Sequence, residues 1–171
     1  MNRYIPTVYK KSVFDINYEN LYNIGIRHLM FDLDNTLTWA KSKEVTTEIR
    51  ELIKKLKNKF TVDIVSNSRK RRVASIAKKL DVGYVSFARK PSVKSFIIIQ
   101  DKYNCGKEEM IIIGDQLLTD IKAGNKYGIK TLLIDPIGND LFVTYYNRWR
   151  ESMKIKKMAE AGILERGKYY E

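Results

Sequence analysis

Short apolar segments alternate with amphipathic ones along most of the chain. Each apolar segment has four or five residues and is rich in Ile, Val, Leu or Phe, as expected of strands buried on both faces of a sheet. Five such strands are predicted, at residues 27–31, 61–65, 84–87, 110–113 and 130–134.

The segments between the predicted strands carry apolar residues at helical spacing. Thr46 or Thr47 is a suitable N-cap for the first helix, Pro91 and Ser92 open the third, and a fourth is expected over residues 119–127. The first three stripes consist of Ile49, Leu52, Ile53, Leu56 and Phe60; of Val73, Ile76, Ala77 and Leu80; and of Val93, Phe96, Ile97 and Gln100. Alternating strands and helices predict an α/β fold. Its parallel sheet should have about five strands, right-handed crossovers and helices on both faces.

A basic and aromatic segment follows the last predicted strand, at about residues 142–165. Phe142, Tyr145, Trp149 and Met153 fall at helical spacing, with Arg and Lys residues between them. Two interpretations remain open. The segment is either a helix that packs over the sheet, or a helix that lies at a membrane surface with its aromatic and basic residues.

Size and charge narrow the class of protein. A chain of 171 residues with 44% hydrophobic residues predicts one domain over residues 1–171 with a real core. The formal net charge is +12, and residues 67–94 hold nine basic residues and one acid, which is eight of those twelve charges. Such clustering favours an anionic partner, an acidic membrane surface or nucleic acid, over a uniformly basic composition.

Neither the cysteine content nor the start of the chain points to secretion. Cys105 is the single cysteine, so no internal disulfide can form, and the first 20 residues contain no apolar segment typical of a signal peptide. We expect a cytoplasmic protein that associates at most peripherally with the inner membrane surface.

Polar residues follow four consecutive predicted strands at the point where each strand ends. Because the carboxyl ends of parallel strands meet at one edge of the sheet, these residues should share a site. In chain order they are Asp32 and Asp34; Ser66 and Asn67; Arg89 and Lys90; and Asp115, with Asp120 further on. Several carboxylates from different strands suit Mg²⁺. Together with a lysine, such a metal stabilises a phosphoryl group in transfer.

Four sequence segments at these positions resemble the ordered motifs of the haloacid dehalogenase superfamily: FDLDNTL, VSNS, ARKP and GDQLLTD. The resemblance implies that Asp32 is the nucleophile, forming an aspartyl-phosphate, and also a metal ligand. Asp34 would be the general acid/base and would bind the metal through its backbone carbonyl. Ser66 and Lys90 would contact the phosphoryl group, and Asp115 would complete the Mg²⁺ site. The resemblance also implies that Thr36, Asn67 and Arg69 bind the substrate and that Asp120 orders the loop.

A broader resemblance covers most of the chain. VFDINYENLYNIGIRHLMFDLDNTL, GDQLLTDIKAGNKYGI and the late TYYNR segment are similar to the YqeG-type branch, which includes phosphatidylglycerophosphate phosphatases of eukaryotic organelles. This implies a Rossmann-like domain. One departure is the run Arg69–Arg72 after VSNS, since cations at a helix N-terminus oppose the helix dipole. Either an anionic substrate offsets this, or the run is a solvated basic face.

The spacing of the motifs leaves no room for an inserted cap domain. Only 33 residues separate Asp32 from Ser66 and 23 separate Ser66 from Lys90, and each interval is filled by one helix and one strand. We therefore expect an open site for a phosphate on a large substrate, first of all a lipid such as phosphatidylglycerophosphate. The alternatives are a phosphatase of nucleic-acid ends or nucleotides, and a non-catalytic RNA- or ribosome-binding module on the same fold.

Overall fold

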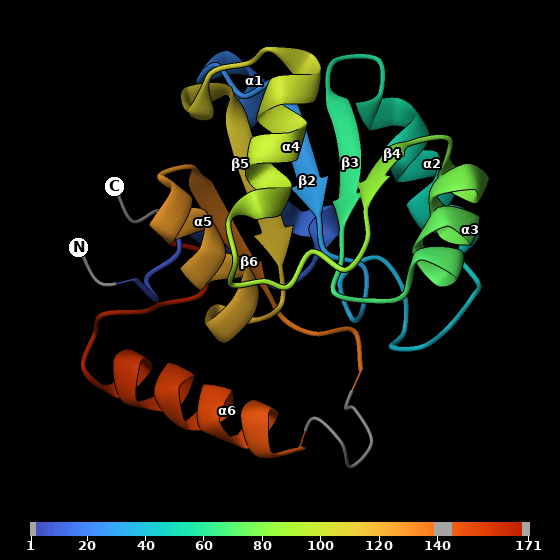
Figure 1. Ribbon diagram of the computed structural model, residues 1–171. Helices are drawn as coiled ribbons and strands as arrows, with labels where there is room; N and C mark the ends of the chain where they lie inside the picture. Colours follow the sequence, from blue (N-terminus) through green and yellow to red (C-terminus); the bar gives the residue numbers. More distant parts are fainter. Residues whose placement is uncertain (1–2, 139–144, 169–171) are drawn as a thin grey trace.

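The computed structural model describes residues 3–138 and 145–168. Its centre is one parallel sheet in the order β1-β6-β5-β2-β3-β4 (Figure 1). The strands are β1 (Val8–Lys10), β2 (His28–Phe31), β3 (Thr61–Val65), β4 (Gly83–Val85), β5 (Met110–Gly114) and β6 (Lys130–Ile134). The predicted open parallel sheet is confirmed, with six strands instead of about five.

The additional strand is β1 at the edge of the sheet. It pairs in parallel with β6, with Val8 opposite Leu132 and Lys10 opposite Ile134. Three residues give no readable alternation, so the sequence alone does not indicate this strand. Its stability comes from pairing with a segment more than 120 residues away.

Helices cover both faces of the sheet. On one face α1 (Tyr18–Asn23), α2 (Thr47–Leu56) and α3 (Lys70–Leu80) contribute to a core with Phe31, Ile64 and Ile113. On the other face α4 (Lys94–Tyr103) and α5 (Lys122–Tyr127) pack against Met30, Val65 and Ile112. Neighbouring strand residues therefore point to opposite cores, which explains why the strands are apolar throughout. The chain also contains three short helical turns: η1 (Val13–Asp15), η2 (Lys107–Glu109) and η3 (Leu117–Ile121).

The helix boundaries refine the predictions. Thr46 is the N-cap of α2, where its Oγ1 accepts the Ile49 N–H at 3.4 Å. The helix ends at Leu56, so Phe60 packs in the core from the start of β3 instead of extending the helical stripe. The fourth predicted helix, residues 119–127, is divided in the structure: the π-helical turn η3 begins at Leu117 and α5 continues from Lys122.

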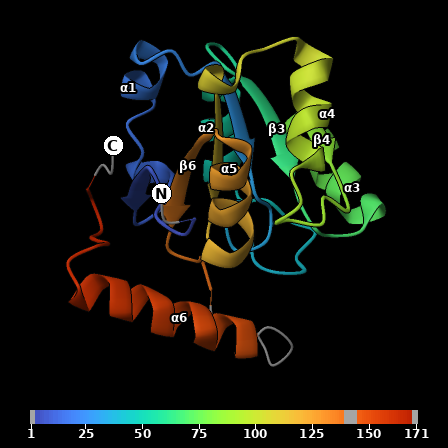
Figure 2. The same ribbon diagram turned by 60° about the vertical axis from the view of Figure 1, so that its left-hand side comes forward.

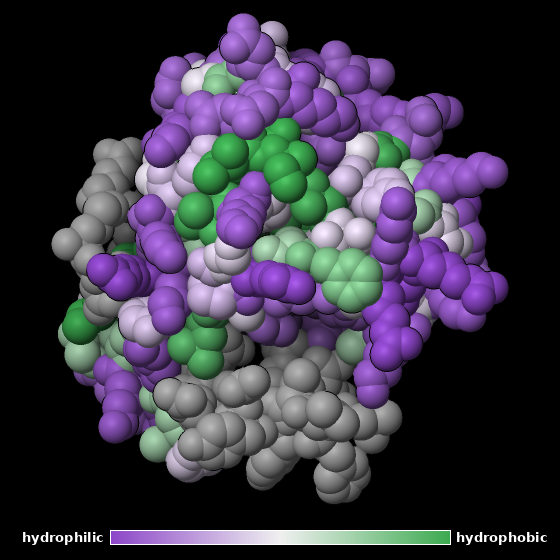
Figure 3. Space-filling model, viewed as in Figure 1, coloured by the Kyte–Doolittle hydropathy of each residue, from purple (hydrophilic) through white to green (hydrophobic). Residues whose placement is uncertain are grey.

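The predicted apolar stripe of α4 is partly wrong. The helix begins at Lys94, after Pro91 and Ser92, and buries Phe96 and Ile99. Ile97 and its neighbour Ile98 are 42% and 54% exposed and contribute to the hydrophobic patch seen over α4 in Figure 3. Three consecutive isoleucines leave the buried face ambiguous in the sequence, and only packing against β5 selects Ile99.

Helix α6 (Tyr145–Glu160) lies beyond the carboxyl ends of the strands (Figures 1 and 2). Met158 is buried against a small cluster that includes Leu117 and Leu133, whereas Trp149 is 51% exposed. The C-terminal half of α6 thus packs on the domain, as the first interpretation of this segment expects. Phe142 lies outside the described residues. Within the described ranges, no helix combines the length and apolar character needed to cross a bilayer.

Candidate active site

Asp32 directly follows β2, a central strand of the sheet. Its N–H donates to the carbonyl of Ile113 at 2.9 Å, which continues the pairing of β2 with β5 past the end of the strand. This register brings the loop after β2 next to the loop after β5, where Asp115 lies. The two carboxylates, 83 residues apart in sequence, therefore meet because their strands are hydrogen-bonded neighbours.

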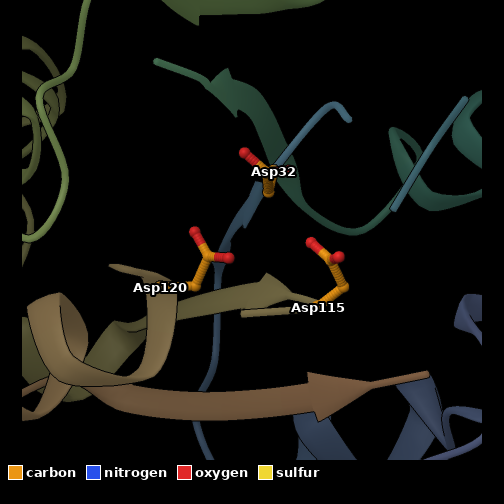
Figure 4. A group of neighbouring side chains, drawn as sticks. All are labelled: Asp32, Asp115 and Asp120. Atoms are coloured by element: carbon orange, nitrogen blue, oxygen red, sulfur yellow. The ribbon is translucent and has the colours of Figure 1, made fainter. Parts of the chain in front are cut away.

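Three buried carboxylates converge here from different segments (Figure 4). Asp32 follows β2, Asp115 follows β5 and Asp120 lies in η3, and each offers an oxygen within 4.8 Å of the others. All three residues are at most 6% exposed. Buried carboxylates at this spacing repel one another unless cations neutralise them.

Lys90 supplies one of those cations. Its Nζ donates to Asp32 Oδ1 at 2.5 Å and to the carbonyl of Val65 at 2.7 Å, and it pairs with Asp120 Oδ1 at 2.6 Å. Three carboxylates and one ammonium leave two negative charges, which suits a divalent cation. The all-oxygen donor set fits Mg²⁺ in particular.

The pKa values at this cluster reflect the same imbalance. Burial raises the pKa of Asp32 to about 7, with contributions from Asp120 and Asp34 that the charge of Lys90 only partly offsets. Burial acts to lower the pKa of Lys90, but the charges of Asp120 and Asp32 outweigh it and raise that pKa. Lys90 is therefore a permanent cation, while Asp32 needs further positive charge to be fully ionised at neutral pH.

Asp34 has a separate environment from this group of three. Its Oδ1 accepts the N–H of Lys41 at 2.9 Å, and its Oδ2 accepts Ser68 Oγ at 2.6 Å and Arg72 Nη1 at 2.8 Å. Burial acts to raise the pKa of Asp34, but these hydrogen bonds and the charge of Arg72 hold it below its usual value. Asp34 is thus a fixed, ionised carboxylate beside the cluster.

Arg72 links Asp34 to the neighbouring segments. Its Nε donates to the carbonyl of Ser42 at 2.8 Å and its Nη1 also donates to Ser68 Oγ at 3.0 Å. The side chain lies in the first turn of α3, which contains no acid and has no side-chain cap. Asp34 therefore supplies the negative charge that this basic helix start lacks, whereas Arg69, Lys70 and Arg71 are exposed.

The other predicted residues differ in where their side chains lie. Ser66 is buried, and its Oγ accepts the N–H of Ser68 at 3.1 Å, which leaves its own proton free to donate. Thr36 Oγ1 donates to Asp115 Oδ1 at 3.5 Å. Asn67 makes two hydrogen bonds to the backbone of Lys90, so its amide holds the loop that carries the lysine. These three side chains belong to the site, and the exposed Arg69 lies at its border.

Two features escaped the sequence analysis. Asp120 was assigned to loop order, and its Oδ2 does accept the Gln116 N–H at 3.2 Å, but its other oxygen pairs with Lys90 and joins the carboxylate group. Arg72 and Ser68, which hold Asp34, were not singled out. Their separation of four residues at a helix start was the available signal.

Gly114 lets Asp120 come this close. A Cβ on Gly114 would lie 2.4 Å from the carboxyl carbon of Asp120, a distance that side chains do not tolerate. The glycine of the GDQLLTD segment is therefore required by a close approach. The backbone after β5 and the turn η3 pack together only without a side chain at this position.

The intervals between the motifs hold no inserted cap domain, as the spacing predicts, although Asp32 itself is buried. The segments between β2 and β3 and between β3 and β4 each contain one helix, so neither contains an inserted domain. Even so, Asp32 is only 6% exposed and Lys90 5%.

Comparisons with known proteins agree with this geometry. Residues 1–138 match the family model described as mitochondrial PGP phosphatase, in which PGP denotes phosphatidylglycerophosphate. The probable phosphatase YqeG of Bacillus subtilis is 32% identical over 95% of each chain. Phosphatidylglycerophosphate phosphatase 1 of Arabidopsis thaliana is 26% identical over 93% of this chain, which spans 49% of that protein.

Solved structures show the same fold. A haloacid dehalogenase-like hydrolase of Streptococcus pneumoniae superimposes with a TM-score of 0.55 at 16% identity, over 68% of this chain and 88% of that one. A cobalt-bound deoxy-D-mannose-octulosonate 8-phosphate phosphatase of Haemophilus influenzae gives 0.51 at 13% identity, over 82% and 94%. The chain therefore belongs to the YqeG and PGP phosphatase family, is a phosphatase, and has the fold of a haloacid dehalogenase-like hydrolase.

Proposed function

We propose that the protein hydrolyses a phosphate monoester with Mg²⁺ through an aspartyl-phosphate on Asp32, and that the substrate is a membrane lipid such as phosphatidylglycerophosphate. The observation that carries the reaction is the group of three buried carboxylates balanced by one lysine. Asp32, Asp115 and Asp120, together with the backbone carbonyl of Asp34, would hold the metal. The bound Mg²⁺ would supply positive charge to the phosphoryl oxygens and to Asp32.

The chain's own residues account for each transfer. A carboxylate oxygen of Asp32 attacks phosphorus, and the bond from phosphorus to the ester oxygen breaks. Asp34, which is ionised in the free protein, first takes up a proton from solvent and gives it to that oxygen, and the alcohol leaves. Asp34 then takes a proton from water, which attacks phosphorus, and the bond to Asp32 breaks with release of phosphate. Ser66 donates its free proton to a phosphoryl oxygen, and Lys90 neutralises charge beside Asp32.

Two features support a membrane-borne substrate. Exposed cations follow the site: Arg69, Lys70 and Arg71 begin α3, and each cation near an anionic surface contributes about 1 kcal/mol. The relatives from Arabidopsis and Chlamydomonas are named as phosphatidylglycerophosphate phosphatases. The protein would then work in the cytoplasm at the inner membrane surface, and the same cations would also attract nucleic acid.

The test is release of phosphate from phosphatidylglycerophosphate in mixed micelles, with Mg²⁺ or with a chelator. Wild type should form phosphatidylglycerol, Asp32→Asn should not, and Asp101→Asn, an exposed carboxylate on α4, should equal wild type. Nucleotides and 5′-phosphorylated oligonucleotides are tested in parallel. Faster turnover of those substrates than of the lipid would identify nucleic acid, and not a lipid, as the substrate class. No turnover of any phosphate ester would contradict the catalytic proposal and favour a binding module.

A further inference from the structure

A cavity of about 420 Å³ lies at the carboxyl end of the sheet, beside the loop that carries Asp32 and Asp34. Most of its wall comes from three segments near strand ends: residues 11–14 after β1, residues 36–39 after β2 and residues 134–137 at the end of β6. Thr46 and Ile49, at the start of α2, complete the wall. Two other cavities, of about 430 and 470 Å³, are both lined by Phe60 and by none of the site residues. The first cavity is thus distinguished by its place at the catalytic edge.

The lining of this cavity is mostly apolar. Val13 and Leu37 are buried in its wall, whereas Phe14, Trp39 and Ile137 are 55%, 57% and 40% exposed. Large apolar side chains that remain accessible around a hollow are typical of binding sites. The ring of Trp39 lies directly against Gly138, where an added Cβ would come within 2.2 Å of it.

The cavity borders the loop that follows Asp32 and Asp34, and Thr36 is the site residue that lines it. Thr36 lines the cavity and donates to Asp115, one of the three clustered carboxylates. On the opposite wall, Ile137 donates its N–H to the carbonyl of Asn35 at 2.9 Å. A ligand in the cavity would therefore contact the same short loop that positions Asp32.

We propose that this cavity binds the hydrocarbon portion of a phosphate ester whose phosphate lies at Asp32. The inference rests on the proposed function and adds a subsite to it. Its volume is within the roughly 300–1,000 Å³ of small-molecule sites. Lys11, exposed at the rim, stands where the cavity meets solvent and adds positive charge beside an anionic ester. The ligand class is an alkyl or acyl phosphate ester, taken either free from solution or from a membrane.

Trp39 provides a direct measure of binding. The chain has two tryptophans, so Trp149→Phe leaves Trp39 as the single reporter, and Asp32→Asn prevents turnover. The probes are butyl, hexyl and octyl phosphate below their micellar concentrations. Each added methylene should tighten binding about 2- to 4-fold and shift Trp39 emission to the blue. Inorganic phosphate should compete with octyl phosphate but not with octanol, because only the ester spans both subsites.

Two rim variants keep the test specific. Phe14→Ser and Ile137→Ser remove exposed apolar side chains, so both should fold, and both should flatten the dependence on chain length. Asp101→Asn, an exposed substitution on α4 that does not line the cavity, should keep the wild-type dependence on chain length. Affinity that does not change with chain length, or a chain-length dependence that survives both substitutions, would overturn the subsite.

These experiments also distinguish the catalytic proposal from the subsite proposal, and a free ester from a membrane lipid as the ligand. If no ester is hydrolysed but octyl phosphate still binds beside Trp39, the catalytic proposal fails and the subsite stands. If esters of every chain length are hydrolysed at the same rate, the catalytic proposal stands and the subsite fails. A short-chain phosphatidic acid is then compared below its micellar concentration and in vesicles. Equal turnover assigns a free ester as the ligand, and faster turnover in vesicles assigns a membrane lipid.

Discussion

Arg72 Nη1 lies 2.8 Å from Asp34 Oδ2 and ties the start of α3 to the loop after β2. The same guanidinium donates to the carbonyl of Ser42, so one side chain contacts both ends of residues 34–42, the segment that follows the catalytic loop. Asp34 is therefore positioned by an ion pair between two elements that are distant in sequence. If Asp34 is the general acid, as we propose, the efficiency of the reaction depends on Arg72.

Arg72→Ala is expected to lower kcat about 10- to 100-fold on alkyl phosphates, part of the 10²–10⁴ that general acid–base catalysis contributes. Loss on 4-nitrophenyl phosphate should be smaller, because that leaving group needs little protonation. Steady-state kinetics on both esters measure the difference. Arg72→Lys should recover part of the activity, and Arg71→Ala, an exposed neighbour, should have no effect. Equal losses on both esters would argue against a role through Asp34.

Asp120→Asn is expected to weaken Mg²⁺ binding by at least about 10- to 100-fold, because it removes one of the three carboxylates that would hold the metal and loss of a mere partner of a ligand already costs that much. The substitution removes one of the two carboxylates that pair with Lys90. The Mg²⁺ affinity is measured from the Mg²⁺ dependence of phosphate release and of the melting temperature. Gly114→Ala should act in the same direction, because its Cβ would displace Asp120. Unchanged Mg²⁺ affinity in both variants would leave Asp120 a purely structural residue.

Mg²⁺ should stabilise the fold more at pH 8 than at pH 5.5. The pKa of Asp32 is raised to about 7 by burial, above its unfolded value of about 3.9. The metal-free protein therefore loses stability as pH rises from about 4 through 7. Mg²⁺ at about 100 times its Kd adds about 2.7 kcal/mol, or roughly 5–10 °C in Tm.

Differential scanning fluorimetry across this pH range tests the Mg²⁺ prediction. Asp115→Asn serves as the matched variant, in which the Mg²⁺ shift should be small at every pH. A shift that is equal at pH 5.5 and pH 8 in wild type would contradict competition between the metal and a proton on Asp32.

His28 should make the protein less stable in mild acid. Burial lowers the pKa of this side chain on β2, partly offset by Glu109 and Asp63. Because the folded pKa lies below the unfolded value of about 6.5, stability is complete above that pH and is lost as pH falls through the folded pKa. Urea unfolding at several pH values should show this loss in wild type and a flatter profile in His28→Phe. If both proteins lose the same stability as the pH falls, groups other than His28 cause that loss.

Local sequence determined the main elements of this fold. The apolar segments at β2, β3, β5 and β6 match the predicted strands to within one residue at each end, because strands buried on both faces leave an uninterrupted apolar signal. The order of the polar residues at the strand ends also brought Asp32, Ser66, Lys90 and Asp115 to one edge. That inference needs only the parallel direction of the strands.

Packing between distant segments decided the rest. β1 exists because β6 offers it a free edge, and the buried face of α4 was chosen among three isoleucines by contact with the sheet. The pairing of Lys90 with Asp120 and of Arg72 with Asp34 depends on distances across the fold that no sequence period encodes. The sequence thus determined which residues could reach the catalytic edge. The tertiary structure decided which charges neutralise one another there, since that depends on separations of a few ångströms in a buried site.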